Sequence, residues 1–170
     1  MPNREELLLQ TERFHVVRAG HPDLPDRAIV RHPGAVTILP FVDDQHICLI
    51  RNYRMSVDRT LVELPAGTLE PGESPRETAS RELAEETGFR AARLEELPAF
   101  FLSPGILDER MHLFVARDLN SGPPDLREDE RIENLIVTFE EALEMIVDGR
   151  IQDAKTIVGL LVYDLRSRSS

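Results

Sequence analysis

Short apolar runs separated by turn residues predict a chain built mainly of consecutive β-strands. The clearest run is Ala35 to Pro40, whose nearly continuous apolar character predicts a strand buried on both faces. Residues 14–31 predict a hairpin, and residues 1–12 fit either a short helix or a loose arm. Strands are expected in the segments 14–18, 27–31, 35–40, 47–51, 60–64, 93–102, 111–116 and 132–137.

The strongest helix signal follows the fifth of these runs. Ser74 is placed as the N-cap, Pro75 as the first helical residue and Glu77 as the partner that completes a capping box. Gly88 stands where a left-handed residue ends a helix. These signals predict a helix over residues 75–87.

Two further helices are expected near the end of the chain. Thr138 and Glu141 have the spacing of a capping box and open a helix that runs to about Val147. Asp153 caps a last helix that runs to about Arg166. Mostly consecutive strands with few helices indicate the α+β class.

Composition narrows the classes of function. The chain has 170 residues, enough for one well-buried domain, and a net charge of −11. This acidic balance argues against a nucleic-acid binder and against binding to an anionic membrane. No apolar run approaches the ~20 residues of a spanning helix, and the acidic start has no signal-peptide form, so we expect a cytoplasmic protein.

Acidic residues are concentrated on the first helix and just before it. Glu82 and Glu86 are four residues apart, which places two like charges on one helix face at some cost in stability. Glu85, Glu70 and Glu73 add to the same region. A solvated acidic face explains the helix alone, but the additional loop acids favour a hard cation, Mg²⁺ or Mn²⁺, between the carboxylates.

The segment from Gly67 to Phe89 resembles a known motif. It reads Gly67, five residues, Glu73, seven residues, Arg81-Glu82-Leu83, any residue, Glu85-Glu86, any residue, Gly88-Phe89, and this fills every defined position of the Nudix box. The resemblance implies the Nudix fold, a mixed β-sheet sandwiched between helices, here with an N-terminal β-hairpin extension. It also implies hydrolysis of a nucleoside diphosphate linked to another moiety.

The resemblance assigns roles within the box. Glu82 and Glu86 are expected to bind the divalent metal, with Glu85 as a further ligand or an orienting acid and the carbonyl of Ala66 completing the site. The metal would neutralise the pyrophosphate and lower the pKa of water.

Other acids are expected to act around the metal ligands. Glu73 and Arg81 are expected to form an ion pair that holds the loop on the helix. The general base is left open between Glu86 and the acids Glu128, Asp129 and Glu130 of a long polar loop expected over residues 118–131.

Flanking residues resemble the ADP-ribose pyrophosphatases. Pro104 lies at the distance after the box that is typical of them, and the segments 31–36, 51–54 and 127–133 are similar to theirs. The implied reaction converts ADP-ribose to AMP and ribose 5-phosphate. Another nucleoside diphosphate sugar is the alternative substrate.

Substrate contacts are predicted from residue type. Arg54 is the first candidate for a phosphate clamp, and Arg27 or Arg31 is the second, because arginine binds phosphate with two hydrogen bonds. Tyr53 is a candidate to stack on adenine. The Pro104 loop is expected to contact the substrate as well.

The chain divides in two by this interpretation. Residues 1–34 form a strand or hairpin region too small to fold alone, and residues 35–170 form the hydrolase domain. The resemblance implies that the first region packs on a partner subunit, which makes the protein a homodimer with shared substrate contacts.

Three other classes compete with this interpretation. A non-catalytic ADP-ribose sensor would usually lose box carboxylates, and this chain keeps them. A prenyl diphosphate isomerase would need a cysteine or acid in its site, and the one cysteine, Cys48, lies in an apolar strand. An RNA-decapping enzyme would need a basic patch, which the sequence lacks.

Overall fold

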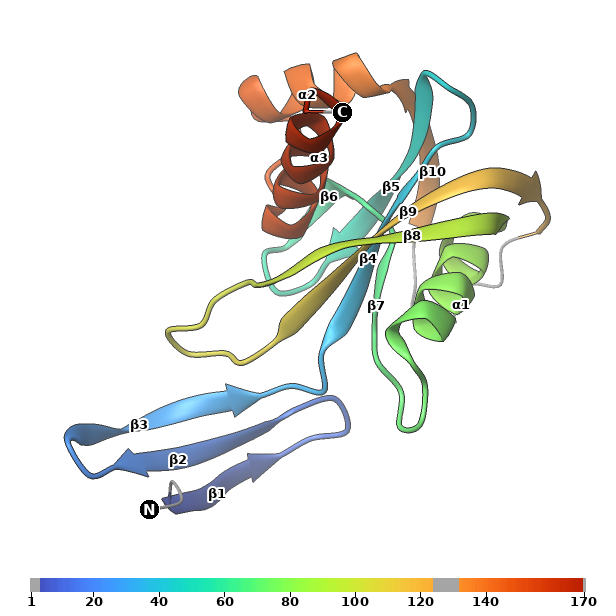
Figure 1. Ribbon diagram of the computed structural model, residues 1–170. Helices are drawn as coiled ribbons and strands as arrows, with labels where there is room; N and C mark the ends of the chain where they lie inside the picture. The colour runs from blue at the N-terminus through green and yellow to red at the C-terminus, as the bar shows by residue number, and fades with distance from the viewer. Residues whose placement is uncertain (1–3, 124–131, 170) are drawn as a thin grey trace.

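The computed structural model describes residues 4–123 and 132–169, and within these it contains three sheets and three helices (Figure 1). The elements in chain order are β1 (Arg4–Gln10), β2 (His15–His21), β3 (Leu24–Arg31), β4 (Ala35–Pro40), β5 (His46–Arg54), β6 (Arg59–Glu63), β7 (Ala66–Thr68), α1 (Pro75–Thr87), β8 (Phe89–Phe101), β9 (Arg110–Ser121), β10 (Ile132–Thr138), α2 (Phe139–Val147) and α3 (Ala154–Ser167).

The strand β4 lies inside a four-stranded mixed sheet of order β7-β4-β9-β8. It runs parallel to β9 and antiparallel to β7, and all six of its residues are buried, as the sequence predicts. Its side chains alternate between two cores. Val36 and Ile38 pack with Ala79 of α1, whereas Leu39 belongs to the core that contains Leu160 of α3.

A second sheet, of order β10-β5-β6, completes the body of the molecule, and both of its pairings are antiparallel. The helix α1 lies on one side of the sheets and α2 and α3 lie on the other (Figure 1). This arrangement confirms the α+β class and the mixed sheet between helices. In the described part of the chain, no helix is long and apolar enough to span a membrane.

The N-terminal residues differ from the prediction. Residues 4–10 form neither a helix nor a loose arm but β1, which pairs with β2 in a separate antiparallel sheet of order β1-β2-β3 (Figure 1). The connection expected over residues 19–26 is a tight turn, because β2 and β3 extend into it. Pairing with β2 decides the conformation of β1, and the local sequence does not reveal that pairing.

Two later strands are also longer than predicted. The strand β8 begins directly after α1 and passes Pro98, and a shift in register between Leu97 and Phe100 accommodates the proline. The strand β9 continues to Ser121, into the segment predicted as loop. The additional residues of β8 and β9 pair with each other, and Phe89 pairs with Ser121 at one end of the two strands.

The helix α1 has the predicted limits and the predicted caps. The Ser74 hydroxyl accepts a hydrogen bond from the Glu77 backbone N–H, and the Glu77 carboxylate accepts one from the Ser74 N–H at 2.8 Å. Gly88 has φ of 77°, a left-handed conformation that glycine adopts without steric cost. The helix is therefore fixed at both ends by local interactions.

Replacing the cap should destabilise the fold without contacting Glu82, Glu85 or Glu86. We expect Ser74→Ala to lower the free energy of unfolding by about 1 kcal/mol, because the hydroxyl no longer accepts a hydrogen bond from the Glu77 N–H or donates one to the Glu77 carboxylate. Urea denaturation measures this loss. Ser56→Ala, in the exposed turn after β5, is the control and should change stability little. Equal stability of both variants would contradict the capping role.

Candidate active site

The buried acids of α1 face the short strand β7. Glu82 and Glu86 are 6% and 5% exposed, which is rare for carboxylates. A Cβ atom at Gly67 would lie 1.9 Å from the carboxyl carbon of Glu82, so the Glu82 side chain occupies the space above the glycine. The Ala66 N–H donates a hydrogen bond to Glu86 Oε2 at 2.9 Å. The backbone of β7 therefore fixes both carboxylates.

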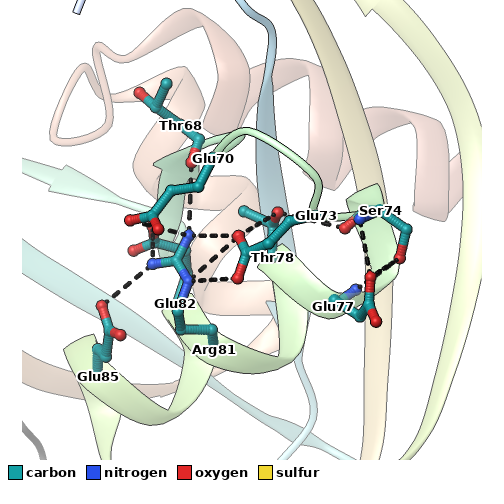
Figure 2. Close-up of polar contacts among 9 residues, drawn as sticks. All are labelled: Thr68, Glu70, Glu73, Ser74, Glu77, Thr78, Arg81, Glu82 and Glu85. Atoms are coloured by element: carbon teal, nitrogen blue, oxygen red, sulfur yellow. Dashed lines mark hydrogen bonds and ion pairs between the residues drawn. The ribbon is translucent and has the colours of Figure 1, made fainter. Parts of the chain in front are cut away.

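Arg81 stands at the centre of the acids (Figure 2). Its Nη1 donates to Glu82 Oε1 at 2.7 Å and to Glu85 Oε2 at 3.2 Å. Its Nε and Nη2 donate to the Glu73 carboxylate, with a shortest distance of 2.9 Å. These bonds, first of all those to Glu73, raise the pKa of Arg81. One cation thus bonds to three carboxylates and neutralises part of their charge.

The ion pair expected between Glu73 and Arg81 is present. Glu73 also accepts a hydrogen bond from Thr78 Oγ1 at 2.9 Å, which ties the loop before α1 to the first turn of the helix. The hydrogen bonds from Arg81 are the largest influence on the carboxyl group and hold the pKa of Glu73 below its usual value. The loop is therefore fastened to α1 by an ionised acid.

The donor atoms at α1 are of the chemical type that a hard divalent cation binds. Glu82, Glu85 and Glu86 offer carboxylate oxygens beside the peptide group of Ala66, and all-oxygen sites suit Mg²⁺ or Mn²⁺. In residues 4–123 and 132–169, no three His, Cys, Asp or Glu side chains converge tightly enough to hold a metal by themselves. The guanidinium of Arg81 is the positive charge between Glu82 and Glu85 in this arrangement.

Arg54, the first candidate for a phosphate clamp, lies at the end of β5. Its Nε and Nη2 donate to the two oxygens of Glu63 at 2.8 and 2.6 Å. Glu86 is among the charges that raise the pKa of Arg54, after the hydrogen bond to Glu63, so the two residues are within electrostatic reach. Tyr53 projects to the opposite face of the strand, and its hydroxyl donates to Asp58. Arg54 and Tyr53 therefore project to opposite faces of β5, and Arg54 is the one within electrostatic reach of Glu86.

The other predicted substrate residues form a separate group. Arg31 donates to Asp108 at 2.9 Å, and it also pairs with Glu5 of β1. Backbone hydrogen bonds join Val30 to the segment that follows Pro104, and Arg27 is exposed on β3. The Pro104 loop is therefore fastened to the N-terminal sheet. Glu128, Asp129 and Glu130 lie outside the described residues.

Sequence reasoning missed two charged residues beside the site. Glu63 is fully buried at the end of β6, and Lys155 of α3 is 7% exposed with its Nζ 2.6 Å from Glu63 Oε2. Two signals were available, namely an acid at the end of an apolar strand and the only lysine in the chain. Neither signal by itself identifies a partner 92 residues away.

A side chain at Gly67 should disturb the acids more than the fold. We expect Gly67→Ala to displace the Glu82 carboxylate and to weaken Mn²⁺ binding about tenfold, as changes beside metal ligands commonly do. Calorimetric titration with Mn²⁺ measures this. Gly72→Ala is the matched control, because nothing lies within 4 Å of its new Cβ and only backbone strain at φ of 89° results. Equal Mn²⁺ affinity in Gly67→Ala and the unmodified protein would refute the assignment of Glu82 as a metal ligand.

Comparisons with known proteins agree with this geometry. The NUDIX domain family model matches residues 31–158. The chain is 43% identical over 142 residues to the ADP-ribose pyrophosphatase of Bacillus subtilis (strain 168), with 82% of this chain and 77% of that protein covered. It is 42% identical over 142 residues to the methanol dehydrogenase activator of Bacillus methanolicus, with the same shares covered.

A solved structure extends the likeness to the whole fold. The crystal structure of an ADP compounds hydrolase superposes with a TM-score of 0.81 at 26% identity and covers 98% of this chain and 92% of its own. The family model spans β4 through α2 and the start of α3, and it includes α1 with all of its acids. This chain belongs to the NUDIX domain family.

Proposed function

We propose that this protein hydrolyses the pyrophosphate bond of ADP-ribose to give AMP and ribose 5-phosphate. The observation that carries the proposal is the buried pair Glu82 and Glu86, held against β7 by Gly67 and the Ala66 N–H. A sensor that only binds its ligand has no need of two buried carboxylates at that cost. Relatives named ADP-ribose pyrophosphatase and ADP compounds hydrolase support the choice of substrate.

Mg²⁺ or Mn²⁺ would be held by the carboxylates of Glu82, Glu85 and Glu86 and by the carbonyl of Ala66. When bound, the ion neutralises charge on the pyrophosphate and lowers the pKa of water. Arg81 and Glu73 keep α1 and the preceding loop in one position, so the acids do not reorganise when substrate arrives.

The remaining roles fall to residues around the acids. Arg54 binds a phosphate with the N–H groups that Glu63 leaves available, since a guanidinium has five donors. Arg27 and Arg31 of the N-terminal sheet, Tyr53 and the Pro104 loop contact the rest of the substrate. One of Glu86, Glu128, Asp129 and Glu130 accepts the proton of the attacking water.

Product analysis with matched variants tests this function. The protein is incubated with ADP-ribose, ADP-glucose or GDP-mannose and Mg²⁺ or Mn²⁺, and products are separated by chromatography. We expect AMP and ribose 5-phosphate from ADP-ribose as the preferred substrate. Glu82→Gln and Glu86→Gln should each lower kcat about 100-fold or more, because metal ligands are lost.

The control for these variants is Glu77→Gln, since Glu77 lies on the same helix but only caps it. It should keep near-normal turnover. Preference for GDP-mannose would replace the substrate, and binding of ADP-ribose without turnover would indicate a sensor. Normal turnover in Glu82→Gln and Glu86→Gln would remove the metal assignment.

We also propose that residues 1–34 form a dimerisation region, that residues 35–170 form the hydrolase domain and that the protein is a cytoplasmic homodimer. Leu7, Leu8 and Leu9 are exposed on β1, and every residue of that strand is exposed in the single chain. Contiguous exposed apolar surface of this kind marks an interface. A second copy would cover it and bring Arg27 and Arg31 toward a neighbouring site.

Charge placed on β1 should separate the subunits. We expect the double variant Leu7→Asp, Leu9→Asp to change the mass measured by light scattering from dimer to monomer, because unpaired buried charge is costly at an interface. Val147→Asp is the control, since that residue is 89% exposed at the end of α2. An active monomer in the unmodified protein would end the proposal.

A further inference from the structure

The only lysine in the chain, Lys155, lies buried beneath the end of β6. Its Nζ is 2.6 Å from Glu63 Oε2, while Arg54 binds both oxygens of the same carboxylate. The exposure of the three side chains rises in order, from 1% for Glu63 to 8% for Lys155 and 39% for Arg54. Glu63 is thus an acid held between a buried cation and a cation that reaches solvent.

The first turn of α3 holds the network of Arg54, Glu63 and Lys155 in place. Lys155 Nζ is 3.0 Å from Asp153 Oδ2, and Asp153 is the N-cap of α3. Thr156 Oγ1 donates to the same Asp153 oxygen and accepts a hydrogen bond from the Leu64 N–H at 2.8 Å. The first turn of α3 is therefore bonded to the end of β6, and the position of Glu63 is set by two elements.

The network also lies next to the acids of α1. Glu63 precedes Ala66 by three residues, and the Ala66 N–H donates to Glu86. Glu86 contributes to the raised pKa of Arg54, where the hydrogen bond to Glu63 is the first cause. The guanidinium of Arg54 is therefore bonded to Glu63 and lies within electrostatic reach of Glu86 on α1.

The charge balance shows what Lys155 adds. Burial raises the pKa of Glu63, but the hydrogen bond from Arg54 and the charges of Lys155 and Arg54 outweigh it, so the pKa lies below its usual value. Glu63 is accordingly ionised at neutral pH. Paired with Arg54 alone, it would cancel the charge of the guanidinium. Asp153, 3.0 Å from Lys155 Nζ, is a second acid of this cluster, so Lys155 and Arg54 together balance two acids, and without Lys155 the cluster would carry a net negative charge.

We propose that Glu63 and Lys155 are positioning residues for Arg54, which binds the pyrophosphate of a nucleoside diphosphate sugar. They fix the orientation of its guanidinium and maintain its attraction for an anion. This inference rests on the proposed function. Glu63 fixes the plane of the guanidinium through two hydrogen bonds. Lys155 keeps the cluster of Glu63, Asp153 and Arg54 from carrying a net negative charge, so that Arg54 keeps its attraction for an anion.

A double-mutant cycle tests the positioning role. Glu63→Asp keeps the negative charge but shortens the side chain by one methylene. The carboxylate that binds Arg54 is withdrawn, so the position of Arg54 changes while the net charge of the cluster does not. Binding of ADP-ribose is measured by calorimetry in EDTA, where turnover is excluded. We expect Glu63→Asp to weaken binding about tenfold, in line with the cost of ångström-scale misplacement. It should have no further effect in Arg54→Ala.

Two variants separate positioning from stability and charge. Val62→Ala, next along β6, removes packing from the same strand without contacting Arg54, and it should lower Tm while leaving ADP-ribose affinity unchanged. Lys155→Met keeps the length of the side chain but leaves Glu63 paired with Arg54 alone. It should weaken binding by a factor similar to that of Glu63→Asp.

Any other result of these measurements contradicts either the inference or the proposed function. Equal losses from Glu63→Asp in both backgrounds, or from Val62→Ala, would make the network structural and overturn the inference. Unchanged affinity in Arg54→Ala would overturn it too, while hydrolysis by the unmodified protein would keep the proposed function. Binding without hydrolysis in Mg²⁺ or Mn²⁺ would remove the proposed function and leave the inference standing. Failure of the unmodified protein to bind ADP-ribose in EDTA would overturn the inference, while hydrolysis in Mg²⁺ or Mn²⁺ would still keep the proposed function.

Discussion

The repulsion among Glu82, Glu85 and Glu86 is the constraint on which the site depends. Two of these carboxylates are buried, and buried like charges persist only with compensating cations and hydrogen bonds. Arg81 supplies the charge within α1, and the backbone of β7 supplies a hydrogen bond and the space above Gly67. The loop, the helix and the strand must all be in place before the acids can stand together.

The strand β4 holds the elements that carry the acids in fixed positions. Its residues face two cores, one beneath α1 and one beneath α2 and α3, so β4 is packed on both faces and its neighbours β7 and β9 are held in register. The second ionic cluster, with Glu63 at its centre, depends on α3 in the same way. Both polar clusters are therefore built on rigid elements, as a preorganised site requires.

Local signals predicted most of the body and the ion pair that fastens the loop to α1. The limits of α1 follow from Ser74, Pro75 and Gly88, because caps act within a few residues of the chain. The expected Glu73–Arg81 ion pair lies within one loop and helix and is present in the structure. The strand β1 and the ends of β8 and β9 were missed, since they depend on pairing with distant residues.

The sequence by itself determined the family motif, the acidic helix and the buried central strand, because spacing along one helix or strand fixes which side chains share a face. Only the tertiary structure decided which basic side chains form ion pairs with which acids. Glu63 and Lys155 are 92 residues apart, and burial at one meeting point pairs them. It also decided that Arg31 binds Asp108 beside the N-terminal sheet while Arg54 binds Glu63 at the end of β6, because chain packing sets where a guanidinium can reach.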